Sequence, residues 1–204
     1  MVLKNFFVFE GIDGAGTSTQ INKLVNCNPD KFVATAEPTT GETGRFLRKM
    51  LGGEFSVDEK TNAFLFAADR CEHIYGKNGI IENINNGKIV ISDRYFFSSL
   101  AYQSISCGDD IPFFVNSKFP LPEYLFYFEI NPELSLSRVN SRNEKKEIYE
   151  NIEAQKKIAF KYNEIISRYD GTNLGENMKV IHIDASKSID EIAEEIKNIL
   201  AGRL

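Results

Sequence analysis

Residues 7–20 form an apolar segment that leads into a glycine-rich turn, Phe-Val-Phe-Glu-Gly-Ile-Asp-Gly-Ala-Gly-Thr-Ser-Thr-Gln. From residue 11 on, the turn matches the phosphate-binding pattern Gly-x-x-x-x-Gly-Lys-Ser/Thr except at Thr17, where the pattern has lysine. Glycines let backbone N–H groups curl around a polyphosphate, and the helix after such a loop directs its positive end at the same anion. This feature restricts the chain to folds in which a strand, a phosphate loop and a helix follow one another.

The loop predicts a nucleotide site whose contacts come from one continuous run: Gly11, Ile12, Asp13, Gly14, Ala15, Gly16, Thr17, Ser18 and Thr19. Ser18 occupies the position at which a hydroxyl normally ligates magnesium, so a nucleotide with Mg²⁺ is the expected ligand. The lysine that Thr17 replaces would place a point charge on the β- and γ-phosphates. That charge must come from elsewhere, or catalysis is weak or absent.

The composition is that of an ordinary globular chain, with 204 residues and a formal net charge of −5. No basic stripe runs along the sequence, which argues against duplex nucleic acid as a partner. No apolar run approaches the roughly 20 residues of a membrane span, and we expect no signal peptide before the first strand. The three cysteines, Cys27, Cys71 and Cys107, lack metal-ligand spacing and are interpreted as reduced thiols of a cytoplasmic protein.

Strand and helix patterns alternate along the chain. Near-continuous apolar runs predict strands at residues 5–10, 32–35, 88–92, 124–130 and 179–183, as a sheet covered on both faces requires. Helical patterns cover residues 18–27, 44–51, 58–75, 95–106, 132–142, 147–168 and 188–200. This order predicts a single three-layer α/β domain over residues 1–204, with a doubly wound, five-stranded parallel sheet flanked by helices.

Two of the predicted helices carry apolar stripes that should face the core. In residues 58–75 the stripe consists of Phe64, Ala67, Ala68 and Cys71. In residues 147–168 the candidate core positions are Ile148, Ile152, Ile158 and Ile165.

Polar residues follow the first three predicted strands. Asp13 lies in the loop after the first strand, Glu37 follows the second, and Asp93 and Arg94 follow the third. Ligands of such sheets bind outside the carboxyl ends of the strands, so these side chains should converge on one crevice. The arginine fork suits a phosphate, and Asp93 could hold a metal-bound water or fix the arginine. The alternative is an ion pair that only stabilises the strand end.

The helices that should cover the crevice carry Arg48 and Arg70. Phe66 lies four residues before Arg70, so the two share a helix face. A ring and an arginine on one face could stack on a base and hydrogen-bond its edge. The alternatives are that both arginines are solvated surface charges and that Phe66 belongs to the core.

The segment at about residues 138–150 carries Arg138, Arg142, Lys145 and Lys146 between two predicted helices. One interpretation is a solvated helix–helix connection. The other is a short mobile lid that brings positive charge onto a transferred phosphate.

Taken together, these motifs resemble the thymidylate kinase family, which are nucleoside monophosphate kinases with the P-loop NTPase fold. The resemblance covers nearly the whole chain in order. It includes the strand–loop–helix start, Glu37-Pro38, Gly44 with Arg48, residues 65–70, Asp93-Arg94-Tyr95, Ser98, residues 101–103, the charged lid and residues 184–189. The Asp-Arg-Tyr element after a buried strand and the Phe-x-x-x-Arg helix are the most specific parts in combination.

The resemblance implies ATP-dependent phosphorylation of dTMP to dTDP, a step of dTTP biosynthesis, by an enzyme that is usually a homodimer. In that family the residue at Asp13 would contact the sugar 3′-hydroxyl, Phe66 would stack on thymine and Arg70 would read the base edge. Arg48 and Arg94 would hold the monophosphate. The adenine of ATP would border the turn of Ala185, Ser186 and Lys187.

The implied substrate-binding set consists of Asp13, Glu37, Arg48, Phe66, Arg70, Arg94, Tyr102 and Gln103. Within it, Tyr102 would lie near the 2′ position and favour deoxyribose. The implied catalytic set is Asp13, Arg94 and Arg142, and the implied magnesium ligands are Ser18 and Asp93.

Two positions depart from the family pattern. Thr17 replaces the loop lysine, and Ala36 stands where family members usually carry an arginine. Loss of one well-placed charge costs roughly 3–4 kcal/mol of transition-state stabilisation, or about a hundred- to a thousandfold in rate. Because Gly14 leaves the loop without a basic residue there, the resemblance implies a family member whose lid arginine, here Arg142, supplies the charge. Magnesium, Lys145 or Lys146 could also take over part of this task.

Three hypotheses remain open from the sequence. The chain is an active kinase for dTMP with a rearranged set of cations, a kinase of the same fold with another nucleotide or nucleoside as acceptor, or a nucleotide-binding protein that has lost catalysis.

Overall fold

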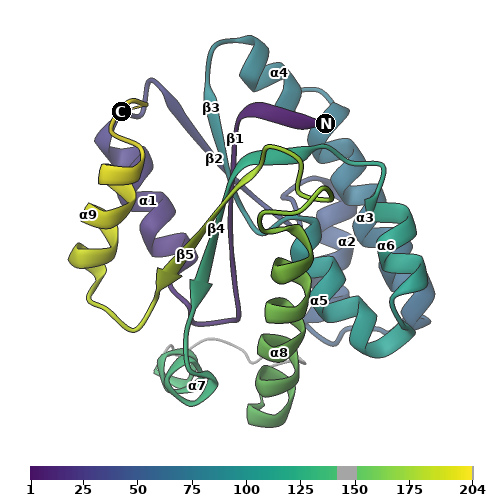
Figure 1. Ribbon diagram of the computed structural model, residues 1–204. Coiled ribbons are helices and arrows are strands. Elements are labelled where there is room, and N and C mark those ends of the chain that lie inside the picture. The colour runs from purple at the N-terminus through teal and green to yellow at the C-terminus, as the bar shows by residue number, and fades with distance from the viewer. Residues whose placement is uncertain (142–150, 204) are drawn as a thin grey trace.

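A five-stranded parallel sheet forms the centre of the protein, in the order β2-β3-β1-β4-β5 (Figure 1). The strands are β1 Val2–Gly11, β2 Phe32–Ala36, β3 Ile89–Asp93, β4 Leu121–Glu129 and β5 Lys179–Asp184. The computed structural model describes residues 1–141 and 151–203. It confirms the predicted α/β class and the parallel sheet. Because β1 is the middle strand, the loop that follows it lies at the centre of the carboxyl edge.

Helices cover both faces of this sheet. They are α1 Thr17–Cys27, α2 Glu42–Leu51, α3 Glu59–Tyr75, α4 Ile80–Asn85, α5 Phe96–Cys107, α6 Asp110–Asn116, α7 Pro132–Asn140, α8 Ile152–Tyr169 and α9 Ile189–Ile199. Figure 1 shows α1 and α9 on one face, and α3, α5 and α8 on the other. The sequence patterns missed α4 and α6, which have only 6 and 7 residues, too few for a helical period to emerge.

The side chains of β1 alternate between two apolar cores. Phe6 and Val8 pack into the cluster under α5 and α8, whereas Phe7 and Phe9 pack into the cluster under α1 and α9. All four are fully buried. This is why β1 reads as a continuous apolar run instead of an alternating one, as a strand covered on both faces must.

The prediction of a buried stripe on α3 was wrong. Phe64 is 52% exposed, and Ala68 and Cys71 are exposed as well, while only Ala67 of that set is buried. The helix instead turns polar side chains inward, because Asp69 and Arg70 have partners inside the protein. The apolar pattern could not reveal this, because polar side chains can be buried as well when they have hydrogen-bond or ion-pair partners.

On α8, Ile158 and Ile165 are buried as predicted, and Ile152 is half-buried. Ile148 lies outside the described residues. Within residues 1–141 and 151–203, no helix is both long and apolar enough to cross a membrane.

Candidate active site

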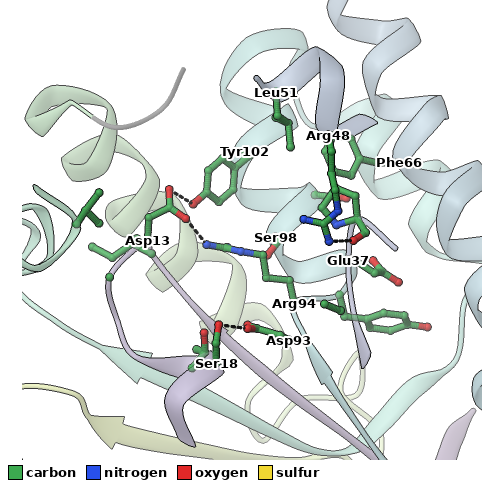
Figure 2. Close-up of a pocket in the computed structure, with 18 of the residues that line it drawn as sticks. Asp13, Ser18, Glu37, Arg48, Leu51, Phe66, Asp93, Arg94, Ser98 and Tyr102 are labelled. Carbon is green, nitrogen blue, oxygen red and sulfur yellow. Dashed lines mark hydrogen bonds and ion pairs between the residues drawn. The ribbon is translucent and has the colours of Figure 1, made fainter. Parts of the chain in front are cut away.

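A cavity of about 430 Å³ opens at the carboxyl ends of β1, β2 and β3 (Figure 2). Its lining comes from the phosphate loop, the ends of β2 and β3, and helices α2, α3, α5 and α7. The sequence-predicted residues among the lining are Ile12, Asp13, Gly14, Gly16, Thr17, Ser18, Thr19, Glu37, Arg48, Phe66, Arg70, Asp93, Arg94, Tyr102 and Gln103. The strand ends therefore converge on one crevice, as parallel strands require.

The phosphate loop adopts the backbone conformations that its glycines permit. Gly14 and Gly16 have φ of +86° and +93°, in the left-handed region that L side chains rarely adopt. Gly14 also lies against α7, where a Cβ atom would come within 2.6 Å of the carbonyl oxygen of Ser135. Gly16 precedes α1, and no side chain caps the N-terminus of that helix. The first N–H groups of α1 are therefore available to an anion.

Ser18 and Asp93 meet at the start of α1 and the end of β3. The Ser18 hydroxyl donates a hydrogen bond to the Asp93 carboxylate. Mg²⁺ prefers oxygen ligands and usually takes only one or two from the protein, with water and substrate phosphates completing its shell. The two side chains fit that role. Among the described residues, no group of three or more His, Cys, Asp or Glu could hold a metal by itself.

Arg94 forms an ion pair with Asp13 across the gap between β3 and the loop (Figure 2). One of its terminal nitrogens donates to the Gly11 carbonyl at 3.0 Å and to the Ser98 and Tyr162 hydroxyls at 3.2 and 3.1 Å. The Arg94 backbone has φ of +70°, uncommon for a residue with a side chain. These contacts fix the guanidinium at the centre of the cavity wall.

Asp13 gathers contacts from three further elements. Its carboxylate accepts from the Tyr102 hydroxyl of α5 at 3.4 Å and from the Gln155 amide of α8 at 3.2 Å. Its backbone carbonyl accepts from the Ser135 hydroxyl of α7. Asp13 is therefore hydrogen-bonded to α5, α7 and α8.

Glu10, which the sequence analysis did not single out, is fully buried beside this ion pair. Its carboxylate accepts from the backbone N–H of Tyr95 and from the hydroxyls of Ser98 and Tyr162, at 2.8, 2.6 and 2.9 Å. Burial raises the pKa of Glu10 to about 7, although the charge of Arg94 and these hydrogen bonds act to lower it. The sequence signal for it was a charged residue at the end of the apolar run Phe6-Phe7-Val8-Phe9.

The other end of the cavity holds Arg48 and Phe66. Arg48 is exposed and donates to the backbone carbonyl of Pro38, and Phe66 is half-buried. Figure 2 shows the two side chains close together, on the far side of Arg94 from Ser18. The cavity therefore has a loop end and an arginine–aromatic end.

Arg70 forms the fully buried floor of the arginine–aromatic end. Its guanidinium donates to Glu37 and Ser99, each at 2.9 Å, and also to Asn116. Glu37 in turn contacts His73 at 3.0 Å. Arg70 is therefore held by protein partners instead of being a solvated surface charge, and Glu37 is the carboxylate that holds it.

The turn of Ala185, Ser186 and Lys187 lies after β5 at the same sheet edge, and none of its residues is among the described lining of the cavity. Arg138 of α7 donates to the Ala185 carbonyl at 2.9 Å, a link that the sequence did not predict. Lys187 pairs with Glu195 at 2.9 Å. Arg142, Lys145 and Lys146 lie outside the described residues.

The fold and the cavity define a P-loop nucleotide-binding protein with a second, arginine-lined subsite. Sequence comparison is more specific, because the family model for thymidylate kinase matches residues 9–196. The chain belongs to the thymidylate kinase family.

Individual relatives agree with this assignment. A protein of Treponema pallidum (strain Nichols) is 41% identical over 198 residues, covering 96% of this chain and 94% of its own. The thymidylate kinase of Leptospira borgpetersenii serovar Hardjo-bovis (strain L550) is 36% identical over 203 residues, which cover 95% of this chain and 92% of that protein.

The buried Glu10 carboxyl makes stability depend on pH. Its pKa in the folded protein, about 7, is above its ordinary value of 4.5, so its contribution to stability is present below pH 4.5 and lost as the pH rises through 7. In Glu10→Gln this position does not titrate. We expect the free energy of unfolding of the natural chain to fall by about 3 kcal/mol relative to the variant between about pH 4.5 and 8. Urea unfolding at several pH values measures this; a constant difference would contradict it.

Proposed function

We propose that this protein transfers the γ-phosphoryl group of ATP to dTMP in the cytoplasm, and so supplies dTDP for dTTP biosynthesis. The observation that carries the proposal is a single cavity that joins a phosphate loop to a second end with Arg94, Arg48 and Phe66. A phosphate loop by itself fits any nucleoside triphosphate. The second end fits a nucleoside monophosphate, because arginine forks suit its phosphate and an aromatic ring suits its base.

At the loop end, the triphosphate of ATP lies along residues 11–18. The N–H groups of the loop and of the first turn of α1 bind its oxygens. Ser18 and Asp93 hold Mg²⁺, which neutralises phosphate charge when bound. The turn of residues 185–187 borders the adenine, and Arg138 keeps this turn joined to α7.

At the arginine–aromatic end, Arg94 and Arg48 hold the phosphate of dTMP, and Asp13 and Tyr102 face its sugar. Phe66 stacks on thymine above the floor formed by Arg70. Gln103 also lines the cavity, and its side-chain oxygen is buried without a hydrogen-bond partner among the described residues. The N3–H of thymine is a donor that would satisfy this acceptor. A nucleoside acceptor would leave both arginines without a phosphate, so it fits less well.

The cation that replaces the loop lysine is the remaining requirement. The cations in the described lining are Arg48, Arg70 and Arg94, and Arg70 is neutralised by Glu37. We assign the missing charge to Arg142, which follows α7 in the sequence. Its guanidinium stabilises the γ-phosphoryl group while an oxygen of the dTMP phosphate attacks in line and ADP leaves. A lid at about residues 138–150 would also exclude water and so suppress hydrolysis of ATP.

The proposed activity is tested by ADP release from ATP and Mg²⁺ with a panel of deoxy- and ribonucleoside monophosphates. We expect turnover with dTMP as the preferred acceptor, because the arginine–aromatic end fits it. The variant Thr17→Lys, measured in parallel, tests whether Thr17 limits the rate. No turnover on any acceptor by the natural chain, with activity recovered in Thr17→Lys, would instead identify a nucleotide-binding protein that has lost catalysis.

Replacement of Arg142 tests its assigned role. Because its charge acts on the transferred phosphoryl group, Arg142→Ala should lower kcat by about a hundredfold or more. The dissociation constant for dTMP should change much less, since Arg48 and Arg94 hold the acceptor. Steady-state kinetics and calorimetric titration measure the two quantities. An unchanged kcat would remove Arg142 from catalysis.

Replacement of Phe66 tests the base-stacking role. Phe66→Ala removes a ring that is half-buried and lines the acceptor end, so dTMP affinity should fall by about tenfold. Affinity for a non-hydrolysable ATP analogue should stay nearly constant, because the loop end is separate. Equal losses for both ligands would identify a packing residue.

The exposed stripe on α3 supports the proposal that the protein is a homodimer. Phe64, Ala68, Cys71 and Tyr75 follow one another at spacings of four, three and four residues, the pattern of a helix–helix seam. All four are exposed, and the two aromatic rings are 52% and 56% exposed. A second copy is the proposed occupant, since a twofold axis across α3 would place the same apolar stripe on both sides.

The dimer proposal predicts that Phe64→Glu lowers the mass in solution from that of a dimer to that of a monomer. In the dimer, the introduced carboxylate would be buried against the second copy without a partner, and burial of an unpaired charge is unfavourable. The matched control is Phe160→Glu on α8, a ring that is 73% exposed and outside the stripe. Sedimentation equilibrium of the natural chain and the two variants measures these masses. A natural chain that is monomeric, or two variants that behave alike, would contradict the proposal.

A further inference from the structure

Glu10 occupies an unusual position for a buried carboxyl. It is the next-to-last residue of β1, directly before the phosphate loop, and its side chain reaches the N-terminus of α5 and the middle of α8. One carboxylate oxygen accepts the backbone N–H groups of Tyr95 and Ser98, at 2.8 and 3.2 Å. The other accepts the hydroxyls of Ser98 and Tyr162. Two backbone donors and two hydroxyl donors thus point at one side chain.

The two backbone contacts make Glu10 a cap for α5 that comes from another strand. The N-cap residue of α5 is Tyr95, and no side chain of its own segment caps the helix. The Tyr95 hydroxyl instead donates to the Pro120 carbonyl at 3.0 Å. The first N–H groups of a helix need an acceptor, and a negative charge there also interacts favourably with the helix dipole. Glu10 therefore fixes where α5 begins relative to β1.

This cap matters for the cavity because α5 forms one of its walls. Ser98, Ser99, Tyr102 and Gln103 all lie in the first eight residues of α5 and line the cavity. The phosphate loop starts one residue after Glu10. One side chain thus connects the loop end of the cavity to the wall of the acceptor end.

The two hydroxyl contacts determine whether donor or acceptor atoms face the Arg94 guanidinium. An ionised carboxylate can only accept hydrogen bonds, and the Ser98 and Tyr162 hydroxyl oxygens also lie 2.7 Å apart. Each hydroxyl therefore directs its proton to Glu10 or to the other hydroxyl, and not to Arg94. Their lone pairs are then free to accept from Arg94, which donates to both, at 3.2 and 3.1 Å. If either hydroxyl turned its proton toward Arg94, donor would face donor. Glu10 thus orients the acceptors that hold the guanidinium.

We propose that Glu10 is a positioning residue for the acceptor phosphate: through the Ser98 and Tyr162 hydroxyls, its carboxylate holds Arg94 facing the cavity. Glu10 does not touch the substrate, and it is not among the residues that line the cavity. The role rests on the proposed function, because it assumes that Arg94 binds the phosphate of dTMP.

Glu10→Gln separates this role from the cap. The amide oxygen can still accept the two backbone N–H groups, but the amide nitrogen donates to the hydroxyls and so competes with Arg94 for their lone pairs. At pH 8 we expect the folded variant to bind dTMP about tenfold more weakly than the natural chain. Affinity for a non-hydrolysable ATP analogue should change less than twofold. Calorimetric titration measures both, and circular dichroism verifies the fold.

A double-mutant cycle with Tyr162→Phe provides the second readout. If Glu10 acts through this hydroxyl, the two substitutions together should weaken dTMP binding less than the product of their separate effects. Should Glu10→Gln not fold, Ser98→Ala and Tyr162→Phe carry the test alone, and each should weaken dTMP selectively. The matched control is Glu123→Gln, a glutamate that is 3% exposed at the amino end of β4 and pairs with Arg203. It should leave dTMP affinity unchanged.

The outcomes are distinguishable from a failure of the proposed function. A natural chain that does not bind dTMP would overturn the function itself. A natural chain that binds dTMP, with Glu10→Gln binding equally well, would overturn only the role of Glu10. Equal losses for dTMP and the ATP analogue, or strictly multiplicative effects with Tyr162→Phe, would also overturn it, because they indicate general structural damage.

Discussion

The ion pair between Asp13 and Arg94 joins the loop after β1 to the end of β3, and the rest of the site is arranged around it. Arg94 reaches this position from a left-handed backbone conformation, which costs roughly 1–2 kcal/mol for a residue with a Cβ atom. Contacts with the Gly11 carbonyl, two hydroxyls and the ring of Tyr102 compensate for that cost. A strained backbone conformation of this kind persists where several contacts fix the residue, as the contacts of the Arg94 side chain do here.

The same pair marks the boundary between the two ends of the cavity. Ser18 and Asp93 lie on the loop side, whereas Arg48 and Phe66 lie on the other, so Arg94 stands between the two ends of the cavity (Figure 2). In the proposed reaction, the transferred phosphoryl group crosses this boundary. Phosphoryl transfer depends mainly on positioning and charge, so rigid support of one arginine at that point is of direct use.

Buried polar groups explain why the sequence pattern mispredicted the buried face of α3 and did not reveal Glu10. On α3, Asp69 is 1% exposed because it accepts from Thr39 and Thr43, and Arg70 is buried with Glu37. These partners lie 26 to 33 residues away in the chain, so no local pattern reveals them. The apolar stripe with Phe64 therefore faces outward instead of inward. Glu10 has the same explanation, because its partner Tyr162 is 152 residues away.

By itself, the sequence determined the five strands, their parallel arrangement and the phosphate loop, since apolar runs and glycine spacing are local and each admits few backbone solutions. It also named the lining residues at the strand ends, because polar residues at the carboxyl ends of parallel strands must converge there. Tyr102 and Gln103, lining residues on a covering helix, were named only through the family resemblance. Only the tertiary structure decided which of these side chains are fixed by hydrogen bonds or ion pairs, and which residues are their partners. The reason is that a hydrogen bond depends on distance and direction in space, and Glu10, Arg94 and Tyr162 meet only once β1, β3 and α8 have packed.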